Sequence, residues 1–420
     1  MMIPKNMKDK TIGILGLGIS GKSALKCLEA VGSRVFAYDD NTSSDLIVTN
    51  PNEWPWHELD QIIISPGIPL THPLVKKAKK LKIQINNEID IFARSLPKAK
   101  VIGVTGTNGK STTTSLLGHI ISFNGFKVQV GGNIGKAASS LTDPGKDGFI
   151  VLELSSFQLE TCNNLILDGA IILNITPDHL EWHGNLNNYY NSKIKIASFL
   201  KKDAPLIISS NDNLCKKATT DLRDNHNVIN INEHNKINLS SIKSFVHFKE
   251  NLIASFRILS FLGISENKSL IAVNTFKGLP HRMEFFLKKE KITFINDSKA
   301  TNAEATLKAL EYYKNIFWIV GGVSKSGGIE PSLNYLGNVR KCFLIGESKN
   351  EFFNTLNNKL ECSISNTIEK ALEEIFSETI NLSEEITVLL SPAAASFDQF
   401  VNFEKRGQIF KKLVLKMWGT

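Results

Sequence analysis

Residues 101–120, VIGVTGTNGKSTTTSLLGHI, contain the pattern that decides the fold. The apolar run at its start predicts a buried strand, and the spacing of apolar residues after Lys110 predicts a helix. Between them, the turn from Gly106 to Ser111 can point backbone N–H groups at phosphate oxygens, beside a positive helix N-terminus. Lys110 suits the β- and γ-phosphates, and the Ser111 hydroxyl suits Mg²⁺. Val104 stands where the strict phosphate-loop pattern has its first glycine, yet the stretch still predicts an ATP site.

A second glycine pattern lies near the N-terminus. Gly16, Gly18 and Gly21 form GxGxxG between a predicted strand and a predicted helix, and Asp39 and Asp40 end the next strand. This arrangement is typical of a site for a nucleoside diphosphate, with a carboxylate for the ribose. It specifies two phosphates and a ribose rather than nicotinamide, so a UDP-linked ligand fits it. A glycine-rich turn made only for packing is the alternative reading.

Predicted strands and helices alternate through the whole chain, which is typical of α/β folds with largely parallel sheets. At 420 residues the chain exceeds one ordinary core. SLPKAK at 95–100 reads as a linker, and the final third starts afresh with the strand KITFINDS. We therefore expect three domains: a Rossmann-like N-terminal domain, a central ATPase domain of phosphate-loop type and a Rossmann-like C-terminal domain, with boundaries at 1–97, 98–279 and 280–420.

Composition narrows the function classes. The net charge of +8 and pI of about 9.0 fit either anionic small substrates or a lysine-rich surface. Lysines are scattered, with KKAKKLK at 76–82 the densest run and no interleaved aromatics, so we expect no nucleic-acid partner. The cysteines at 27, 162, 215, 342 and 362 form no CxxC pair, and reduced thiols in a cytoplasmic protein fit them best. Neither a signal peptide nor a membrane span is apparent, so we expect no membrane insertion.

Polar residues follow two later apolar strands. Glu153 ends FIVLE, and its place at a strand end makes it a candidate Mg²⁺ ligand. His179 follows AIILNIT, although His183 is an alternative polar histidine. Lys193 and Lys195 lie in a predicted helix, and a lysine near a metal can become neutral enough to react with CO₂ and give a carbamate.

These stretches together resemble the Mur ligase family, in particular its D-glutamate-adding branch. The resemblance covers nearly the whole chain in order and spacing. It rests on GVTGTNGKST, GGNIG (131–135), ELSSFQLE (153–160), NITPDHL (174–180), GLPHRME (278–284), NDSKATN (296–302), LLSPAAASFDQF (389–400) and SPG (65–67). It implies an ATP-dependent ligase that joins D-glutamate to UDP-N-acetylmuramoyl-L-alanine, and we expect a monomer.

The resemblance also implies roles at the ATP end. Lys110 would hold the γ-phosphate, and Ser111 and Glu153 would bind one Mg²⁺. Glu153, His179 and a carbamylated Lys193 would surround a second Mg²⁺. The expected ATP-binding residues are Gly106, Thr107, Asn108, Gly109, Lys110, Ser111, Thr112, Asn251, Arg282 and Asp297.

Two further sets of residues match substrate positions of the family. Those for the UDP-muramoyl substrate are Ile19, Ser20, Asp39, Asp40, Gly67 and Asn133, and those for D-glutamate are Lys299, Thr301, Lys325, Ser396 and Phe403. The chain departs from the family pattern at Phe248, where an Asn near the adenine is common, and at Asn41, where an Arg near the uridine is common.

The implied reaction needs carboxylate activation, because joining a carboxylate to an amine is uphill in water. Transfer of the ATP γ-phosphoryl group gives an acyl phosphate, which the D-glutamate amine attacks. His179 is the candidate base for the amine proton. The rival readings are a folate polyglutamylating ligase, which has no need of the N-terminal GxGxxG, a nicotinamide oxidoreductase, and a non-catalytic ATP-sensing module.

Overall fold

The computed structural model describes residues 2–40, 48–209, 211–231, 242, 249–325, 327–380 and 384–419. The chain forms two compact units, Met1–Phe276 and Lys277–Thr420. Each of the three sequence regions expected to be a domain contains one sheet, and the expected α/β class is confirmed. The boundaries at 97/98 and 279/280 remain predictions.

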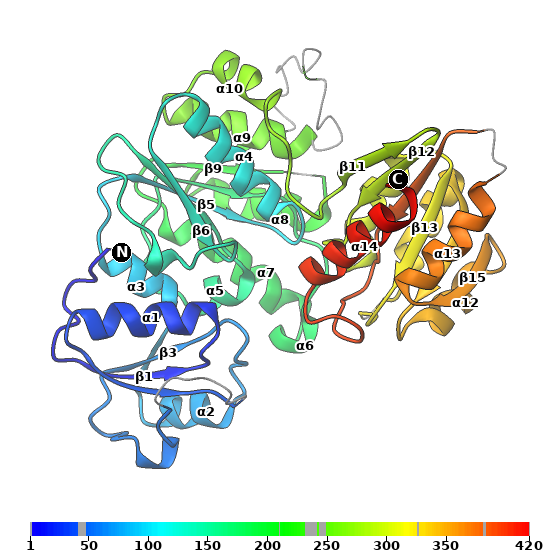
Figure 1. Ribbon diagram of the computed structural model, residues 1–420. Helices are drawn as coiled ribbons and strands as arrows, with labels where there is room; N and C mark the ends of the chain where they lie inside the picture. The colour runs from blue at the N-terminus through cyan, green and yellow to red at the C-terminus, as the bar shows by residue number, and fades with distance from the viewer. Residues whose placement is uncertain are drawn as a thin grey trace. The chain divides into compact units, whose positions relative to one another are not determined.

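The N-terminal region has a parallel four-stranded sheet of order β2-β1-β3-β4. Helices α1 and α3 cover one face, and α2 covers the other (Figure 1). Its elements are β1 (Thr11–Leu15), α1 (Ile19–Ala30), β2 (Arg34–Tyr38), β3 (Gln61–Ile64), α2 (Pro73–Lys80), β4 (Gln84–Asn86) and α3 (Glu88–Arg94). The turn between β1 and α1 is the GxGxxG segment, so it opens at the carboxyl ends of the strands.

The central region has a parallel six-stranded sheet of order β10-β9-β8-β5-β7-β6. Its strands are β5 (Lys100–Thr105), β6 (Val128–Gly132), β7 (Phe149–Glu153), β8 (Gly169–Ile172), β9 (Pro205–Ile208) and β10 (Asn227–Asn230). Its helices are α4 (Lys110–Phe123), α5 (Ser156–Thr161), α6 (Leu180–His183), α7 (Leu186–Ile194), α8 (Asn213–Arg223), α9 (Lys249–Phe261) and α10 (Glu266–Val273).

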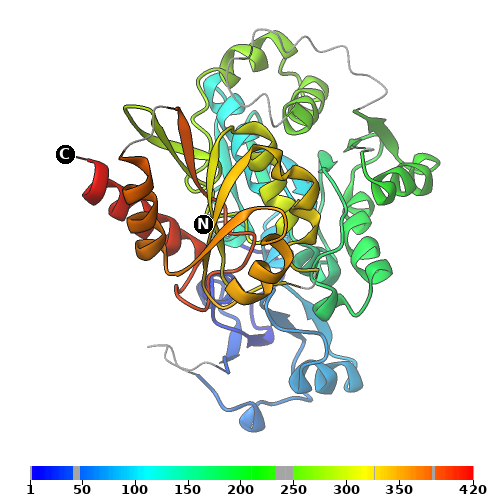
Figure 2. The ribbon, with the colours of Figure 1, turned by 90° about the vertical axis from the view of Figure 1, so that its right-hand side faces the viewer.

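Helices pack on both faces of this central sheet, which is why strands β5, β7, β8 and β9 are almost continuously buried. One core lies between the sheet and α4, α9 and α10, and the other lies between the sheet and α3, α5, α7 and α8. Figure 2 shows the same elements from the side. β5 is a central strand, so the phosphate loop that follows it is held by the most buried part of the sheet.

The second unit has a six-stranded sheet of order β11-β12-β16-β13-β14-β15, parallel except for β11. Its elements are β11 (Glu284–Lys289), β12 (Ile292–Asn296), α11 (Ala303–Tyr312), β13 (Ile316–Gly321), β14 (Val339–Ile345), α12 (Lys349–Leu356), β15 (Glu361–Asn366), α13 (Ile368–Thr379), β16 (Ile386–Leu390) and α14 (Phe403–Trp418). Helices α13 and α14 pack on one face of this sheet.

None of the helices in the described parts of the chain has the length and apolar character that a membrane crossing needs.

Candidate active site

The loop between β5 and α4 has the backbone that its glycines predict. Gly106 has φ of 153° and Gly109 has φ of 83°, both in the region that favours glycine. A Cβ at Gly109 would lie 2.6 Å from Nδ2 of Asn251, so a side chain would collide there. Gly109 is the N-cap of α4, and the buried Ser111 and Thr112 form its first turn. The loop therefore presents a helix N-terminus suited to phosphate.

Two lysines converge on one carbonyl of this loop. Lys110 Nζ donates to the carbonyl oxygens of Gly106 and Thr107, each at 2.8 Å. Lys193 Nζ, from α7, donates to the same Gly106 oxygen at 2.7 Å. These lysines are more than eighty positions apart in the sequence, and in the fold both side chains donate to the same carbonyl oxygen.

Lys193 is almost completely buried, with 1% of its surface exposed. Burial lowers its pKa far below the ordinary value, and the positive charge of Lys110 lowers it further, while Asp178 and Glu153 oppose this. A lysine with a depressed pKa has a larger share of the neutral amine that reacts with CO₂. Lys195 instead donates to the Glu160 carbonyl at 2.8 Å, away from the loop.

Asn174 supports the phosphate loop, a role that sequence reasoning missed. Its backbone carbonyl accepts from Thr107 N at 2.9 Å, and its side chain accepts from Asn108 N at 2.7 Å and donates to the Asn108 carbonyl at 3.0 Å. Tyr189 adds a bond between its hydroxyl and Thr107 Oγ1 at 2.8 Å. The only sequence signal was that Asn174 directly follows the apolar segment that contains β8.

Asn251 also contacts this loop rather than lying apart from it. Its Nδ2 donates to Thr113 Oγ1 at 2.8 Å and lies 3.3 Å from the Gly109 carbonyl. The structure thus brings α9 beside the start of α4, and Asn251, which the family resemblance implies to be an ATP contact, lies at the phosphate loop.

Glu153, at the end of β7, has one carboxylate oxygen bonded and one without a partner. Asn133 Nδ2 donates to Oε1 at 2.8 Å. Oε2 is buried and has no hydrogen-bond partner. A buried carboxylate oxygen without a partner is costly unless a cation or proton meets it, and this fits a metal ligand. The described residues contain no group of three or more His, Cys, Asp or Glu that could hold a metal. Mg²⁺ commonly takes one or two carboxylates and completes its shell with water and phosphate.

The two candidate histidines differ in environment. His183 is buried, its Nε2 lies 3.0 Å from Ser156 Oγ, and burial lowers its pKa to about 4. His179 has a side chain 35% exposed and a left-handed backbone with φ of 54°. Its Nε2 lies 3.5 Å from a carboxylate oxygen of Asp178, and its ring packs edge-on against Phe157. The accessible histidine is therefore His179, and His183 serves the packing of α6 and α7.

A pocket of about 400 Å³ lies at the GxGxxG turn. Three separate segments line it, at the ends of β1, β2 and β3. Its walls include Gly16, Gly18, Ile19, Ser20, Asp39, Asp40, Ser65, Pro66, Gly67 and Ile68. Five of the six residues predicted for the UDP-muramoyl substrate line this pocket: Ile19, Ser20, Asp39, Asp40 and Gly67. The sixth, Asn133, does not line it and donates to Glu153.

Glycines 16 and 21 are required by close contacts in this turn. A Cβ on Gly21 would lie 1.9 Å from the Gly16 carbonyl oxygen, and Gly16 has φ of 86°. Asp39 accepts from the Leu17 N–H at 2.5 Å, and Asp40 lies 3.2 Å from His72 Nε2. Asp39 thus holds the turn as well as facing the pocket, a double role that its position at a strand end did not reveal.

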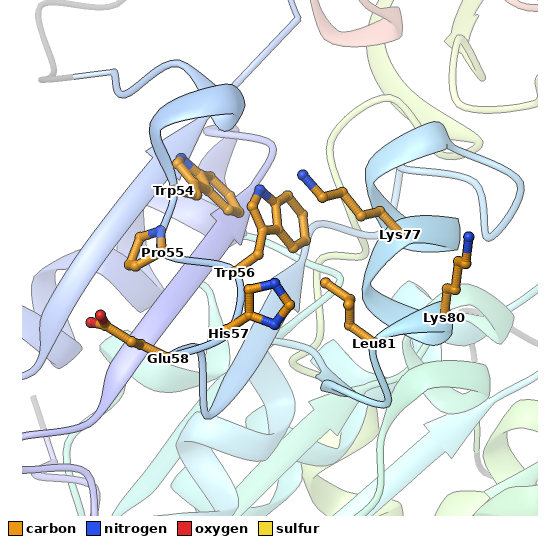
Figure 3. Close-up of a pocket in the computed structure, with 8 residues that line it drawn as sticks. All are labelled: Trp54, Pro55, Trp56, His57, Glu58, Lys77, Lys80 and Leu81. Carbon is orange, nitrogen blue, oxygen red and sulfur yellow. The ribbon is translucent and has the colours of Figure 1, made fainter.

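Another pocket, of about 500 Å³, contains none of the predicted site residues (Figure 3). Trp54 and Trp56 stack on its wall with ring centroids 5.4 Å apart, and Lys77 Nζ lies 4.2 Å above the Trp56 ring. Both indole N–H groups donate to nearby backbone carbonyls. The tryptophans belong to the core under α2, and we assign the pocket no role.

In the second unit, Asp297 follows β12 and is fully buried. Its carboxylate accepts from the Met283 N–H at 3.0 Å and from Ser391 Oγ at 2.8 Å, and Arg282 Nη1 lies 3.6 Å away. Burial raises its pKa, which the charge of Arg282 counteracts. Arg282 and Asp297, both predicted to contact ATP, are therefore neighbours. The Asp297 carboxylate is hydrogen-bonded within its own unit.

The residues predicted for D-glutamate lie in several separate segments of the same unit, and Phe403 is the first residue of α14. Lys299 Nζ lies 4.6 Å from the ring centroid of Phe403, so these two meet. Ser396 is buried, and its carbonyl accepts from the Phe400 N–H at 2.8 Å. Thr301 and Lys325 are half-buried.

Arg406, three residues after Phe403, was missed by sequence reasoning because no motif marks it. It is buried, and its guanidinium donates to Ser298 Oγ and to the carbonyls of Ser298 and Ala394 at 2.9–3.0 Å. Its Nη1 is buried without a partner, and burial lowers its pKa to about 10. The arginine joins NDSKATN to the SPAAAS segment.

The two departures from the family pattern, Phe248 and Asn41, lie outside the described residues.

Comparison with known proteins gives one family. The model of the Mur ligase middle domain matches residues 104–270. Among curated proteins, the UDP-N-acetylmuramoylalanine–D-glutamate ligase of Rickettsia bellii is 36% identical, over 97% of this chain and 97% of its own length. The enzymes of the same name from Caulobacter vibrioides and Brucella abortus are 35% and 36% identical, over 98% and 100% of this chain and 97% and 98% of their own lengths.

Solved structures agree on the fold. UDP-N-acetylmuramate–alanine ligase from Thermotoga maritima is similar with a TM-score of 0.59 at 18% identity, over 97% of this chain and 99% of its own. MurF ligase from the same organism, solved in complex with ADP, has a TM-score of 0.59 at 17% identity, over 99% and 97%. At these identities the structures show the fold alone. With the full-length identities to the curated enzymes, they show that the chain belongs to the Mur ligase family, among its UDP-N-acetylmuramoylalanine–D-glutamate ligases.

Proposed function

We propose that the chain joins D-glutamate to UDP-N-acetylmuramoyl-L-alanine at the expense of ATP, releasing ADP and phosphate, as a step of peptidoglycan synthesis. The curated relatives, which are similar to this chain over nearly its whole length, are named for this reaction. The structural observation that carries the proposal is the convergence of Lys110 and Lys193 on the Gly106 carbonyl, within electrostatic range of Glu153. That cluster combines a phosphate loop, a candidate metal ligand and a lysine suited to modification.

The chemistry assigned to the loop is phosphoryl transfer to the alanine carboxylate. The loop N–H groups and the α4 N-terminus bind phosphate oxygens, and Lys110 compensates the charge of the transferring group. Lys110 Nζ bonds two loop carbonyls and so lies against the loop that would hold the phosphates. The acyl phosphate then reacts with the amine of D-glutamate, and the carbonyl–phosphate bond breaks to release phosphate. His179, the accessible histidine, is our candidate for accepting the amine proton.

The residues fit Mg²⁺, of which we propose two. Ser111, Glu153, His179 and a carbamylated Lys193 would hold them, and the unpartnered oxygen of Glu153 is the observation that favours a cation there. Mg²⁺ neutralises phosphate charge when bound. Carbamylation turns the buried amine of Lys193 into an anion, which a neighbouring cation would stabilise.

We assign the two substrates to separate regions. The pocket of about 400 Å³ at the GxGxxG turn takes the UDP part of the first substrate. Lys299, Thr301, Lys325, Ser396 and Phe403 take D-glutamate, whose two carboxylates need cations and hydroxyl donors. Asn251, Arg282 and Asp297 complete the ATP contacts.

We further propose that the chain acts as a monomer in the cytoplasm, with a role in cell shape and division that follows from wall synthesis. The five free thiols fit a reducing compartment.

A coupled phosphate-release assay tests the proposal. Purified protein with ATP, Mg²⁺ and UDP-N-acetylmuramoyl-L-alanine should release phosphate rapidly only when D-glutamate is added. L-alanine, L-lysine and L-glutamate serve as matched amino-acid controls, because other Mur ligases share the fold but differ in the amino acid they add. Phosphate release that depends on another amino acid, or that ignores all of them, would refute the assignment of D-glutamate. Oxidation or reduction of a nicotinamide cofactor by the same protein would favour the oxidoreductase reading.

A further inference from the structure

Two cysteines occupy opposed positions on neighbouring strands of the second unit. Cys342 in β14 pairs directly with Cys362 in β15 in the parallel register. Neighbouring strands lie about 4.8 Å apart, and disulfides join residues whose Cα atoms are about 4.4–6.8 Å apart. The backbone spacing at this pair therefore already lies in the range that a disulfide accepts.

Both thiols lie on the same face of the sheet. The next residues, Phe343 and Ser363, face the other side, since Phe343 joins the core under α13 and Ser363 Oγ donates to Glu374 of α13 at 2.5 Å. Side chains alternate along a strand, so Cys342 and Cys362 both point away from α13. The Cys342 and Cys362 thiols shift each other's pKa, and Cys362 Sγ donates to the Leu360 carbonyl at 3.5 Å. No change of strand register is needed to bring the sulfurs together.

An ion pair one residue before the two cysteines holds β14 and β15 in this register. Lys341 Nζ lies 2.7 Å from Glu361 and 2.6 Å from Glu378 of α13, on the face opposite the thiols. The Lys341–Glu361 pair precedes the cysteine pair on both strands and ties the edge strand β15 to β14.

The two thiols differ in access and in acidity. Cys342 is fully buried, and burial raises its pKa. Cys362 is half-buried on the edge strand, and the hydrogen bond from Cys342 lowers its pKa. The thiolate is the nucleophilic form of cysteine, so Cys362 is the thiol that reacts first with an oxidant from solvent. The other three cysteines are buried, with raised pKa values: Cys27, Cys162 and Cys215.

We propose that Cys342 and Cys362 form a redox modification site, which hydrogen peroxide closes to an intramolecular disulfide. The Cys362 thiolate attacks one peroxide oxygen, the O–O bond breaks, and a sulfenic acid and hydroxide form; the hydroxide becomes water by taking up the proton that the Cys362 thiol released. The Cys342 sulfur then attacks the sulfenic sulfur, the S–O bond breaks, and the hydroxide leaves with the Cys342 proton as water. The two thiols together lose two electrons, and the peroxide is reduced to water.

Peptide mapping of the intact chain tests this site. The protein is treated with graded hydrogen peroxide, quenched, alkylated with N-ethylmaleimide in denaturant and digested without a reductant. We expect a crosslinked pair of peptides containing Cys342 and Cys362, lost on treatment with dithiothreitol. At the same dose, Cys27, Cys162 and Cys215 should stay alkylatable, with loss at least ~10-fold slower, because their thiolate forms are disfavoured.

Two variants separate the roles of the thiols. In Cys342→Ser, Cys362 should become a sulfenic acid that dimedone traps; in Cys362→Ser, Cys342 should stay alkylatable at the dose that closes the native pair. Circular dichroism checks that each variant folds. If a variant does not fold, the peptide map of the peroxide-treated native chain alone tests the proposal. The proposal is overturned if native Cys362 reacts no faster than the buried cysteines, if it oxidises without crosslinking to Cys342, or if Cys342 reacts equally in Cys362→Ser.

Discussion

Glu88 gives a prediction about the pH dependence of stability, with a sign and a size that can both be worked out. It begins α3, is 2% exposed, and one of its oxygens accepts from the Ser139 N–H. The other oxygen is buried without a partner, and burial raises the pKa of this carboxyl to about 7 from an ordinary 4.5. Glu88→Gln keeps the shape and the acceptor but removes the ionisation. We expect the substitution to change how the stability of the first unit depends on pH.

The sign and size follow from linkage. A carboxyl whose pKa is raised in the folded chain holds its proton longer there than in the unfolded chain. Its contribution to stability is therefore complete below pH 4.5 and is lost as the pH rises to about 7. The full shift corresponds to about 3 kcal/mol, since each pH unit between the two pKa values contributes about 1.4 kcal/mol. Wild type should thus lose up to about 3 kcal/mol relative to Glu88→Gln between pH 4.5 and pH 8.

The assay is urea unfolding of wild type and variant at several pH values from 4.5 to 8, followed by circular dichroism. At each pH we take the difference in unfolding free energy between wild type and Glu88→Gln. This difference cancels the contribution of His183, which is present in both proteins and changes stability over the same pH range with the opposite sign. The pKa of His183 is lowered to about 4, so its contribution is lost as the pH falls below about 6.5. Glu29→Gln, on the exposed face of α1, is the matched control and should show no such trend. A constant difference between wild type and Glu88→Gln across this range would refute the reasoning.

Three predictions concern the ligase site. Lys110→Ala should lower turnover by ~10²-fold or more, because the charge on the transferring phosphoryl group is then uncompensated; steady-state turnover above about a tenth of wild type would contradict this. Lys193→Ala should be nearly inactive and partly restored by acetate or formate, which replace the carbamate; equal restoration of Lys195→Ala, whose amine bonds Glu160, would argue against a carbamate. Lys325→Ala should lose ~10- to 100-fold in kcat/KM for D-glutamate while the KM for ATP barely changes. A loss confined to ATP would move Lys325 to the nucleotide site.

The fold could be predicted because its key signals are local. The glycine turns after β1 and β5 each sit between an apolar strand and a helix, and the alternation of such segments gives the α/β class. The pocket at Gly16 was predictable for the same reason, since residues at the ends of parallel strands gather at one edge of a sheet.

What sequence reasoning missed depends on contacts between distant residues. Asn174 holds a loop that is 66 residues earlier, and nothing in its neighbourhood marks that pairing. The bond from Asn133 to Glu153 joins residues twenty positions apart, while the predicted contact of Asn133 with the substrate stays a prediction. The choice between His179 and His183 needed burial, because both lie in the same short segment. The reactive difference between Cys342 and Cys362 depends on the register of two strands, which no motif encodes.

The most direct test of the central claim follows oxygen from the carboxylate to phosphate. The protein is incubated with ATP, Mg²⁺, D-glutamate and UDP-N-acetylmuramoyl-L-alanine whose alanine carboxylate carries a heavy isotope at both of its oxygens. If the carboxylate is activated as an acyl phosphate, mass spectrometry should find one heavy oxygen in each phosphate released and a product extended by D-glutamate. Phosphate without the heavy isotope, or labelled phosphate with no D-glutamate in the product, would contradict the proposed ligase.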